Sequence, residues 1–363
     1  MIFSRPPLTI DVVPLLDDQW TGIPVFTQRL VLALRRHGQL DLRFGINGLA
    51  IPADDVEGAL RAGTGVYLRD VRARLLAARR PKAVDRRIPI VYPSVKRDCG
   101  LTRREASTVH DLSTLFMPEH HEDGNVLHHI ENFQQELATD EVVFCASEAT
   151  RAALSTAFPS ASPKTRVLHQ YVEWPEEFPI LERNLPRLAL GRYALVVGTI
   201  EPRKNLRLIL QAVGATEIAR SGISFVIIGR KGWLMERALE ELTPAQRDRV
   251  RFTGFVSEFT KYRLLKHAEF LVYPSLYEGF GIPAVEAMSL GKPVLAARSS
   301  SFPEVIGDAG VYFDPVSVAE FTAAFKEIQH PKKLKQLGPK ALTQAATFSW
   351  PRMAQPVVDW VSG

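Results

Sequence analysis

The stretch Phe270–Met288, FLVYPSLYEGFGIPAVEAM, joins an apolar run to a glycine-containing turn and then to a helical pattern. The run FLVYPS has the composition of a buried strand, and Pro283 fits the first turn of a helix because a proline has no N–H to lose there. Two glutamates, Glu278 and Glu286, stand on either side of the turn. The pattern is either an ordinary connection from a strand to a helix or one half of a binding site, and other parts of the sequence are needed to distinguish the two.

Short apolar runs alternate with helical patterns on both sides of this stretch. Runs without a polar face are typical of parallel strands that helices cover on both sides. In the second half of the chain these runs are YALVVGT (193–199), SFVIIGR (224–230), VRFTGFV (250–256), FLVYPS (270–275) and PVLAA (293–297). In the first half they are LTIDVV (8–13), IPIVYPS (88–94), ASTVHD (106–111) and EVVFCAS (141–147). The sequence therefore predicts an α/β protein with two parallel sheets.

The length of 363 residues suits two domains. The segment 173–191, EWPEEFPILERNLPRLALG, has the proline-rich composition of a linker, so we place the boundary near residue 185. We expect an N-terminal Rossmann-like domain over 1–185 and a C-terminal Rossmann-like domain over 186–346. The segment 347–363 is expected to form a terminal helix, since Ser349 and Pro351 are typical helix openers.

Composition narrows the class of protein. No apolar run approaches the roughly 18 residues that span a bilayer, and the first residues do not read as a signal peptide, so we expect a cytoplasmic protein. Cys99 and Cys145 are too few for a disulfide framework. The segment 61–104 holds thirteen Lys and Arg against three Asp and Glu, among apolar residues. It is either a solvated helix face or a surface that lies peripherally on an anionic membrane.

Ligands of open parallel sheets bind beyond the carboxyl ends of the strands. The sequence EPRKN (201–205) follows the first strand of the second half, and it places Arg203 and Lys204 where a helix begins. Two cations beside helix N–H groups suit a diphosphate. The alternative is a pair of solvated surface cations.

The opening stretch supplies the complementary features. Gly279 and Gly281 leave the backbone of the turn open to close approach by a ligand. The carboxylate of Glu286 can accept two hydrogen bonds from the vicinal hydroxyls of a ribose. A favourable helix dipole would explain Glu286 alone, but it would not explain Glu278 and the glycine pair together.

One further candidate lies in the first half. His110 and Asp111 follow an apolar strand, and a histidine there could hydrogen-bond or deprotonate a hydroxyl; a structural histidine is the alternative. The histidines within 120–129 show no metal-binding spacing, so we expect no metal and no cofactor. Nucleoside triphosphate hydrolysis, dinucleotide redox chemistry and nucleic-acid binding lack their characteristic motifs.

Three segments together resemble glycosyltransferase family 4, a retaining, nucleotide-sugar-dependent family with the GT-B fold. They are VVGTIEPRKNLRLIL, FTGFVSEFTKYRLLKHAEFLVYPSLYEGFGIPAVEAMSLGKPVLAARSSSFPEVIGDAG and VHDLSTLFMPEHH. The resemblance covers nearly all of the second half and patches of the first, and Glu278 and Glu286 match the E-x7-E pattern of the family. It implies two Rossmann-like domains whose parallel sheets face a central cleft, with a C-terminal helix that crosses back to the N-terminal domain.

The resemblance also implies roles for individual residues. The implied donor-binding residues are Gly198, Thr199, Arg203, Lys204, Phe255, Glu278, Gly279, Phe280, Gly281 and Glu286. The implied catalytic residues are His110, Arg203, Lys204 and Glu278. Gly22, Ile23 and Asp111 would contact the acceptor or a phosphate, although Pro24 departs from the glycine-rich loop of the family by removing an N–H.

The implied reaction is the metal-independent transfer of a hexosyl group from a nucleoside-diphosphate sugar to an acceptor hydroxyl. The expected donors are GDP-mannose and dTDP- or GDP-rhamnose, and the expected acceptor is a glycan or a lipid-linked glycan of surface-polysaccharide assembly. A lipid-linked acceptor would suit the segment 61–104 at a membrane surface. Two alternatives stay open: a nucleotide-sugar 2-epimerase of the same fold, and a non-catalytic subunit that binds sugar nucleotides.

Overall fold

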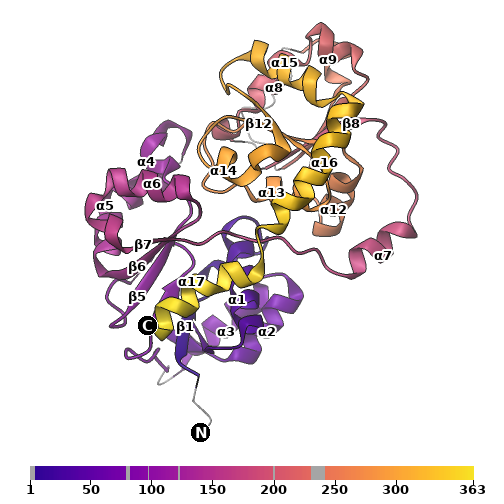
Figure 1. Ribbon diagram of the computed structural model, residues 1–363. Helices are drawn as coiled ribbons and strands as arrows, with labels where there is room; N and C mark the ends of the chain where they lie inside the picture. The colour runs from indigo at the N-terminus through magenta and orange to yellow at the C-terminus, as the bar shows by residue number, and fades with distance from the viewer. Residues whose placement is uncertain (1–4, 79–81, 97, 122, 199–200, 230–241) are drawn as a thin grey trace. The chain divides into compact units, whose positions relative to one another are not determined.

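The computed structural model describes residues 5–78, 82–96, 98–121, 123–198, 201–229 and 242–363 (Figure 1). The chain forms two compact units. Unit 1 comprises Met1–Tyr171 together with Ser349–Gly363, and unit 2 comprises Val172–Phe348. The division thus comes earlier in the chain than residue 185, and the proline-rich segment belongs wholly to unit 2.

Unit 1 is built on a mainly parallel sheet with the strand order β3-β2-β1-β4-β5-β6-β7, in which only β3 runs antiparallel to its neighbour among the described strand pairs. The strands are β1 (Pro7–Asp11), β2 (Asp41–Ile46), β3 (Leu49–Ile51), β4 (Ile90–Tyr92), β5 (Glu105–Val109), β6 (Asp140–Cys145) and β7 (Thr165–Val167). The residues of β4 and β5 are buried throughout, as expected for central parallel strands.

Helices cover this sheet. They are α1 (Ile23–His37), α2 (Ala53–Ala62), α3 (Val66–Ala77), α4 (Ser113–Phe116), α5 (Asp123–Thr139), α6 (Glu148–Ala157) and α17 (Trp350–Ser362), with the 3-10 turns η1 (Val13–Leu16), η2 (Pro118–His120) and η3 (Pro159–Lys164). Ser147 is the N-cap of α6, because its hydroxyl accepts a hydrogen bond of 3.0 Å from the N–H of Thr150. Gly38 ends α1 in the left-handed conformation, which glycine adopts readily.

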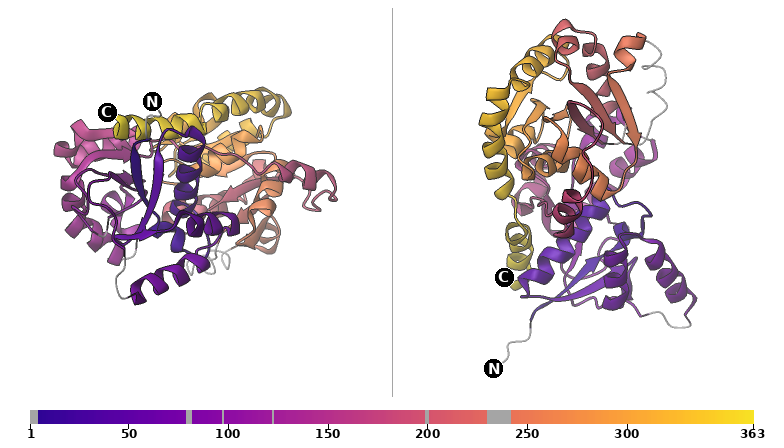
Figure 2. Two further views of the ribbon diagram at one scale, coloured as in Figure 1. Left: turned by 90° about the horizontal axis from the view of Figure 1, so that it is seen from below. Right: turned by 90° about the vertical axis from the view of Figure 1, so that its right-hand side faces the viewer.

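The last helix of the chain belongs to unit 1. Helix α17 packs against α1, and the two lie side by side in Figures 1 and 2. Met353, Ala354 and Val357 of α17 are fully buried in the same apolar core as Phe26 and Leu30 of α1. The predicted terminal helix is therefore an integral part of the core of unit 1.

A buried ionic cluster holds the starting ends of two strands in unit 1. The ammonium of Lys96, which is fully buried, lies 3.1 Å from Glu105 Oε2 at the start of β5 and 2.7 Å from Asp140 Oδ1 at the start of β6. It also donates to the hydroxyl of Thr139 at 2.6 Å. Burial raises the pKa of Asp140 to about 6, although Lys96 and the hydroxyl of Ser107 act in the opposite direction.

Unit 2 is built on a sheet with the strand order β10-β9-β8-β11-β12-β13, and its described strand pairs are all parallel. The strands are β8 (Tyr193–Val197), β9 (Ser224–Ile228), β10 (Val250–Gly254), β11 (Leu271–Tyr273), β12 (Val294–Ala297) and β13 (Gly310–Phe313). The helices are α7 (Glu177–Arg183), α8 (Leu206–Ala212), α9 (Thr216–Arg220), α11 (Pro244–Arg247), α12 (Glu258–His267), α13 (Ile282–Ser289), α14 (Phe302–Ile306), α15 (Val318–Ile328) and α16 (Pro331–Ala346), with η4 (Pro202–Lys204) and η5 (Gly307–Ala309). The predicted pair of parallel-sheet α/β domains is confirmed.

The proline-rich segment is packed onto unit 2. Glu182 of α7 is buried and binds two side chains of α12, with Oε2 at 2.6 Å from Arg263 Nε and Oε1 at 2.6 Å from His267 Nε2. Phe178 of α7 packs on Tyr262 of α12 with ring centroids 5.5 Å apart. Although its composition is typical of a linker, the segment therefore contains a helix, α7, that is attached to α12 by the carboxylate of Glu182 and by aromatic packing.

No helix within the described parts of the chain combines the length and the apolar character that crossing a membrane requires.

Candidate functional site

The predicted cations lie on a turn at the carboxyl end of β8. The short helix η4 carries Arg203 and Lys204, and Asn205 closes the turn in the left-handed conformation with φ 54°. The amide of Asn205 donates to the carbonyls of Pro274 at 3.2 Å and Pro315 at 2.8 Å. The turn is thereby attached to the loops that follow strands β11 and β13, which explains why an asparagine follows the two cations.

Both cations converge on Glu278, which follows β11. Lys204 forms an ion pair with Glu278 Oε1, and Arg203 Nη1 lies 3.4 Å from Glu278 Oε2. Arg203 also donates to the carbonyl of Tyr277 at 2.7 Å and to Glu201 Oε1 at 2.7 Å. Burial alone would raise the pKa of Glu278, but Lys204 and Arg203 outweigh it, so that this pKa lies below its ordinary value. Residues that are far apart in the sequence therefore form one charged cluster at adjacent strand ends.

The glycine turn is held by hydroxyls from the loop after β12. The hydroxyl of Ser300 accepts from the N–H of Glu278 at 2.8 Å, and the hydroxyl of Ser301 donates to the carbonyls of Glu278 and Phe280 at 2.9 and 3.1 Å. Ser300 and Ser301 were not among the predicted site residues; they belong to the run ARSSSFPE directly after a predicted strand. Their position beyond a strand end was the signal that could have identified them.

Gly279, Phe280 and Gly281 shape the turn that opens α13. Gly281 has φ 89°, and a Cβ on it would lie 2.9 Å from Phe302 Cε1, so the position requires glycine. Gly279 is buried, and Phe280 is buried against Phe348 with ring centroids 5.3 Å apart. The ring of Phe280 thus packs in the interior and stabilises the turn, and it is not exposed to solvent.

Glu286 lies within α13 and is 2% exposed. Its Oε1 forms an ion pair of 2.7 Å with the ammonium of Lys261 in α12. Lys261 was not among the predicted site residues, since it lies on the helix before β11 and belongs to no motif. Glu286 is therefore paired with a different cation from the pair that binds Glu278.

Three of the other predicted donor-site residues stand as follows. Gly198 directly follows β8, and Lys204 lies beside it, with Cε 3.6 Å from the position of a Cβ on Gly198. Phe255 follows β10 and is 49% exposed, at the end of a strand that is separated from β8 by β9. Thr199 lies outside the described residues.

In unit 1, His110 follows β5 and contacts the start of α1. Its Nε2 lies 2.7 Å from the carbonyl oxygen of Pro93, so Nε2 carries the hydrogen and Nδ1 is the nitrogen that can accept a proton. The ring meets Phe26 edge to face, with centroids 4.7 Å apart. Burial lowers the pKa of His110 below 6.5, although the carbonyl of Pro93 and Asp111 act in the opposite direction. His110 is therefore neutral at neutral pH.

Gly22 precedes α1 with φ 55°, and nothing lies within 4 Å of a Cβ built on it, while Ile23 is the first residue of the helix. The loop is thus open at Gly22, close in the sequence to the Phe26 that supports His110. Asp111 Oδ1 accepts from the N–H and the hydroxyl of Ser113 at 2.9 and 2.6 Å. Asp111 accordingly shapes the start of α4.

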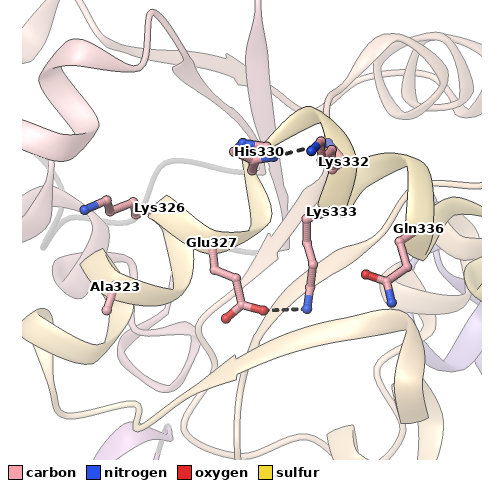
Figure 3. Close-up of a pocket in the computed structure, with 7 residues that line it drawn as sticks. All are labelled: Ala323, Lys326, Glu327, His330, Lys332, Lys333 and Gln336. Atoms are coloured by element: carbon pink, nitrogen blue, oxygen red, sulfur yellow. Dashed lines mark hydrogen bonds and ion pairs between the residues drawn. The ribbon is translucent and has the colours of Figure 1, made fainter.

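One depression at the surface of unit 2 lies away from these residues. It has a volume of about 510 Å³ and is formed by α15 and α16, with Lys326, Glu327, His330 and Lys333 among its lining residues (Figure 3). It contains none of the predicted site residues. Among the described residues, no group of three or more His, Cys, Asp or Glu side chains is arranged to hold a metal ion.

The two clusters differ in the chemistry that they can perform. In unit 2, two cations and the amides of a glycine turn at one sheet edge can bind a multiply charged anion. In unit 1, a neutral imidazole can hydrogen-bond a hydroxyl or accept its proton.

Comparison with known proteins gives a consistent family. Residues 185–343 match the family model described as "Glycosyl transferases group 1". The chain is 31% identical over 265 residues to the O-antigen chain mannosyltransferase B of Escherichia coli, covering 68% of this chain and 67% of the relative. It is 27% identical over 264 residues to the serotype-specific mannosyltransferase WbdA of Escherichia coli, but it spans only 32% of that longer protein.

Solved structures share the fold over almost the whole chain. Sucrose-phosphate synthase from Thermosynechococcus elongatus superposes with a TM-score of 0.68 at 18% identity, over 99% of this chain and 98% of that one. WaaG, a glycosyltransferase involved in lipopolysaccharide biosynthesis, superposes with a TM-score of 0.64 at 14% identity, over 98% of this chain and 100% of that one. The fold is therefore GT-B, and the chain belongs to the group 1 glycosyltransferases, the family 4 that its sequence resembles, and is a glycosyltransferase.

Proposed function

We propose that the protein transfers a mannosyl group from a nucleoside-diphosphate sugar to a hydroxyl of a glycan or lipid-linked glycan, with retention at the anomeric carbon. The observation that carries the proposal is the convergence of Arg203 and Lys204 on Glu278 at the carboxyl ends of β8 and β11 in a family 4 chain. The names of the relatives as O-antigen and serotype-specific mannosyltransferases favour mannose and surface-polysaccharide assembly. A rhamnosyl donor is the second candidate.

Unit 2 would bind the donor. Arg203 and Lys204 would neutralise the diphosphate, while the amides of the turn at Gly279 and Gly281 would face its oxygens. As the bond from the sugar to the phosphate breaks, negative charge grows on the departing diphosphate, and fixed cations stabilise that charge without reorganisation. Glu278 would hold both cations in position until the donor binds, and it would then contact the hydroxyls of the transferred sugar.

Unit 1 would bind the acceptor. His110, with Nε2 fixed on the carbonyl of Pro93, presents Nδ1 as a hydrogen-bond acceptor for a sugar hydroxyl. In a same-face displacement, the acceptor oxygen bonds to the anomeric carbon, the bond to the phosphate oxygen breaks, and the departing phosphate takes the acceptor proton. His110 would orient that hydroxyl.

The alternatives make different predictions. A nucleotide-sugar 2-epimerase would consume a UDP-sugar without an acceptor, and a non-catalytic subunit would bind the donor without turnover. The reported relatives are transferases, which favours transfer over epimerisation.

The test is a calorimetric titration of the protein with GDP-mannose, GDP-rhamnose, dTDP-rhamnose and UDP-glucose, followed by a turnover assay with and without a mannose-terminated glycan. We expect GDP-mannose to bind and its sugar to be transferred only when the glycan is present. Donor consumption without a glycan, with an altered sugar as product, would support the epimerase. Binding without turnover on any glycan would support the subunit, and no binding of any donor would contradict the proposed site.

We also propose that unit 1 lies against an anionic membrane surface through the segment 61–104. Helix α3 exposes Val66, Tyr67 and Leu76 at 49%, 43% and 59%, and Arg69 and Arg74 of the same helix are exposed. Exposed apolar side chains among arginines suit the boundary between headgroups and acyl chains. In sedimentation with vesicles, we expect binding to phosphatidylglycerol-containing vesicles that weakens as salt rises. Equal binding to neutral and anionic vesicles would contradict this proposal.

A further inference from the structure

Lys261 stands outside the residues that motifs identify, yet it is bonded to Glu286. Its ammonium lies 2.7 Å from Glu286 Oε1, and the Glu286 side chain is 2% exposed whereas that of Lys261 is 23% exposed. A buried carboxylate is stable when a cation accompanies it, and here that cation reaches the surface beside the carboxylate. The pair therefore offers a hydrogen-bond donor and an acceptor side by side.

Trp174 fixes this pair from a second direction. Its indole ring lies 5.6 Å from the Lys261 ammonium. Its Nε1 donates to the hydroxyl of Ser289 at 2.9 Å, and that hydroxyl donates to the backbone carbonyl of Glu286 at 2.8 Å. Trp174 also packs on Tyr262, with ring centroids 5.3 Å apart. Trp174, in the segment before α7, therefore contacts both α12 and α13 near the Lys261–Glu286 ion pair.

The chemistry of the pair matches a diol. A hydroxyl both donates and accepts a hydrogen bond, a carboxylate only accepts, and an ammonium only donates. A ribose hydroxyl can therefore donate to Glu286 while it accepts from Lys261. A 2′-deoxyribose has lost one of the two adjacent hydroxyls, and it would leave a group of the pair without its partner.

We propose that Lys261 is a specificity-determining residue of the donor site: with Glu286 it recognises the two adjacent ribose hydroxyls, so that the donor is a ribonucleoside-diphosphate sugar and not a thymidine-diphosphate sugar. The inference rests on the proposed function and on the expectation from the sequence that Glu286 binds the ribose of the donor. It selects among the expected donors, since GDP-mannose and GDP-rhamnose carry ribose and dTDP-rhamnose does not.

The experiment compares matched nucleotide pairs by calorimetry on the full chain: GDP with 2′-deoxy-GDP, UDP with 2′-deoxy-UDP, and ADP with 2′-deoxy-ADP. For the base that binds best, we expect the ribonucleotide to bind about tenfold or more tightly than its 2′-deoxy form. In Lys261→Met this preference should fall to about threefold or less, and Lys261→Arg should keep most of it.

Lys266→Met is the matched control. It removes the same charge from the same helix, but Lys266 lies over the ring of Tyr262, at 5.6 Å from its centroid, and not at Glu286. The ribose preference of the control should equal that of the wild type. A Lys261→Met protein that fails to fold would be replaced by Lys261→Gln, judged by the same ratio of affinities.

The outcomes separate this inference from the proposed function. Equal binding of ribo- and deoxyribonucleotides to the wild type, or a full preference retained in Lys261→Met, would overturn the role of Lys261 and leave the transferase proposal standing. A wild-type protein that binds no nucleoside diphosphate would overturn both. A preference that disappears in Lys261→Met and persists in Lys266→Met would support the inference.

Discussion

Single residues in this site are chosen for their backbone conformation as much as for their charge. Gly281 has φ 89° and Asn205 has φ 54°, and both stand where a strand end turns into a helix. Left-handed backbone favours glycine, and it tolerates asparagine better than most other residues. The residues between and around them, Arg203, Lys204 and Glu278, are thereby presented at one edge of the sheet.

Gly281→Ala should destabilise the protein by about 1–3 kcal/mol, because a Cβ there adds a contact of 2.9 Å with Phe302 to the cost of the left-handed conformation. It should also weaken nucleotide binding, since the amides of the turn would move. The control is Gly191→Ala, where φ is 68° but nothing lies within 4 Å of the added Cβ. Urea unfolding and calorimetry would check both variants, and equal effects on binding would contradict the account.

His110 should act as a neutral hydrogen-bond acceptor over the physiological pH range. Burial lowers its pKa, so the folded protein binds the proton less readily than the unfolded chain. Its contribution to stability is therefore present above pH 6.5 and is lost as the pH falls through the lowered value. We expect kcat/KM to stay flat until the pH is below 6.5.

His110→Gln should reduce kcat by about 10²-fold while nucleoside-diphosphate affinity stays within about twofold, because the imidazole orients the acceptor hydroxyl and does not contact the nucleotide. A pH–rate profile with an acidic limb centred above 6.5 that disappears in His110→Gln would contradict the neutral assignment.

At the scale of elements, the strand-end turns act as fixed supports. The turn with η4 is tied to two other loops through the side chain of Asn205, and the glycine turn is tied to the loop after β12 through Ser300 and Ser301. These contacts connect loops that are distant in the sequence. They show why the run EPRKN ends in asparagine and why serines follow β12.

Two variants, Asn205→Gly and Asn205→Ala, distinguish the contribution of the left-handed backbone conformation from that of the side-chain hydrogen bonds. Asn205→Gly keeps access to left-handed backbone but loses the bonds to Pro274 and Pro315, at a cost of about 1–3 kcal/mol, and Asn205→Ala adds about 1 kcal/mol of backbone strain. Nucleotide affinity should fall in the same order. Thermal unfolding with and without nucleotide would measure both, and an alanine variant that equals the glycine variant would show that the conformation is not limiting.

Lys96→Met should destabilise unit 1 by about 3–5 kcal/mol, because it leaves Glu105 and Asp140 buried without their shared cation.

Stability should also depend on the protonation of Asp140. The pKa of Asp140 is shifted upward, whereas the pKa of a carboxylate in a surface ion pair is usually shifted downward. The folded state binds this proton more readily, so stability should decline as the pH rises from about 4 through about 6.

Unfolding of the wild type and of Asp140→Asn across that pH range would test the sign. The decline that belongs to Asp140 should be absent in Asp140→Asn. If both proteins show the same dependence on pH, the assignment of the proton to Asp140 is wrong.

For the whole molecule, periodicity and motifs predicted the architecture and singled out the residues of the charged cluster in the proposed donor site. Apolar strands in alternation with helices gave two parallel sheets, and the positions beyond strand ends identified Arg203, Lys204 and Glu278 as neighbours. What could not be predicted depends on tertiary contacts. Lys261 belongs to no motif. The composition of the segment 173–191 gives no sign of the contacts of Glu182 with Arg263 and His267, or of the packing of Trp174, which attach the segment to the rest of unit 2.

The end of the chain should determine the stability of unit 1 and not that of unit 2. Trp360 of α17 is 8% exposed, packs on Phe144 with centroids 6.3 Å apart, and lies under the guanidinium of Arg104 at 5.6 Å. Trp360→Ala should cost about 3–5 kcal/mol. In a calorimetric scan, the variant should lower the transition of unit 1, while added nucleotide should raise the transition of unit 2.

A variant that lowers the nucleotide-sensitive transition by the same amount would show that the two units unfold as one.

The central claim is that Arg203 and Lys204 bind the diphosphate of the donor. The most direct measurement is the affinity for a nucleoside diphosphate, together with the rate of hexosyl transfer, in Lys204→Met and in the double variant with Arg203→Met. The control is Arg207→Met, which removes an exposed cation from the second position of α8, the helix that follows η4. With about 1.5–3 kcal/mol for each charged hydrogen bond, we expect affinity to fall about tenfold or more per side chain and transfer to fall at least as much, with the control near wild type. Folded variants that bind the diphosphate and transfer the sugar as the wild type does would contradict the account.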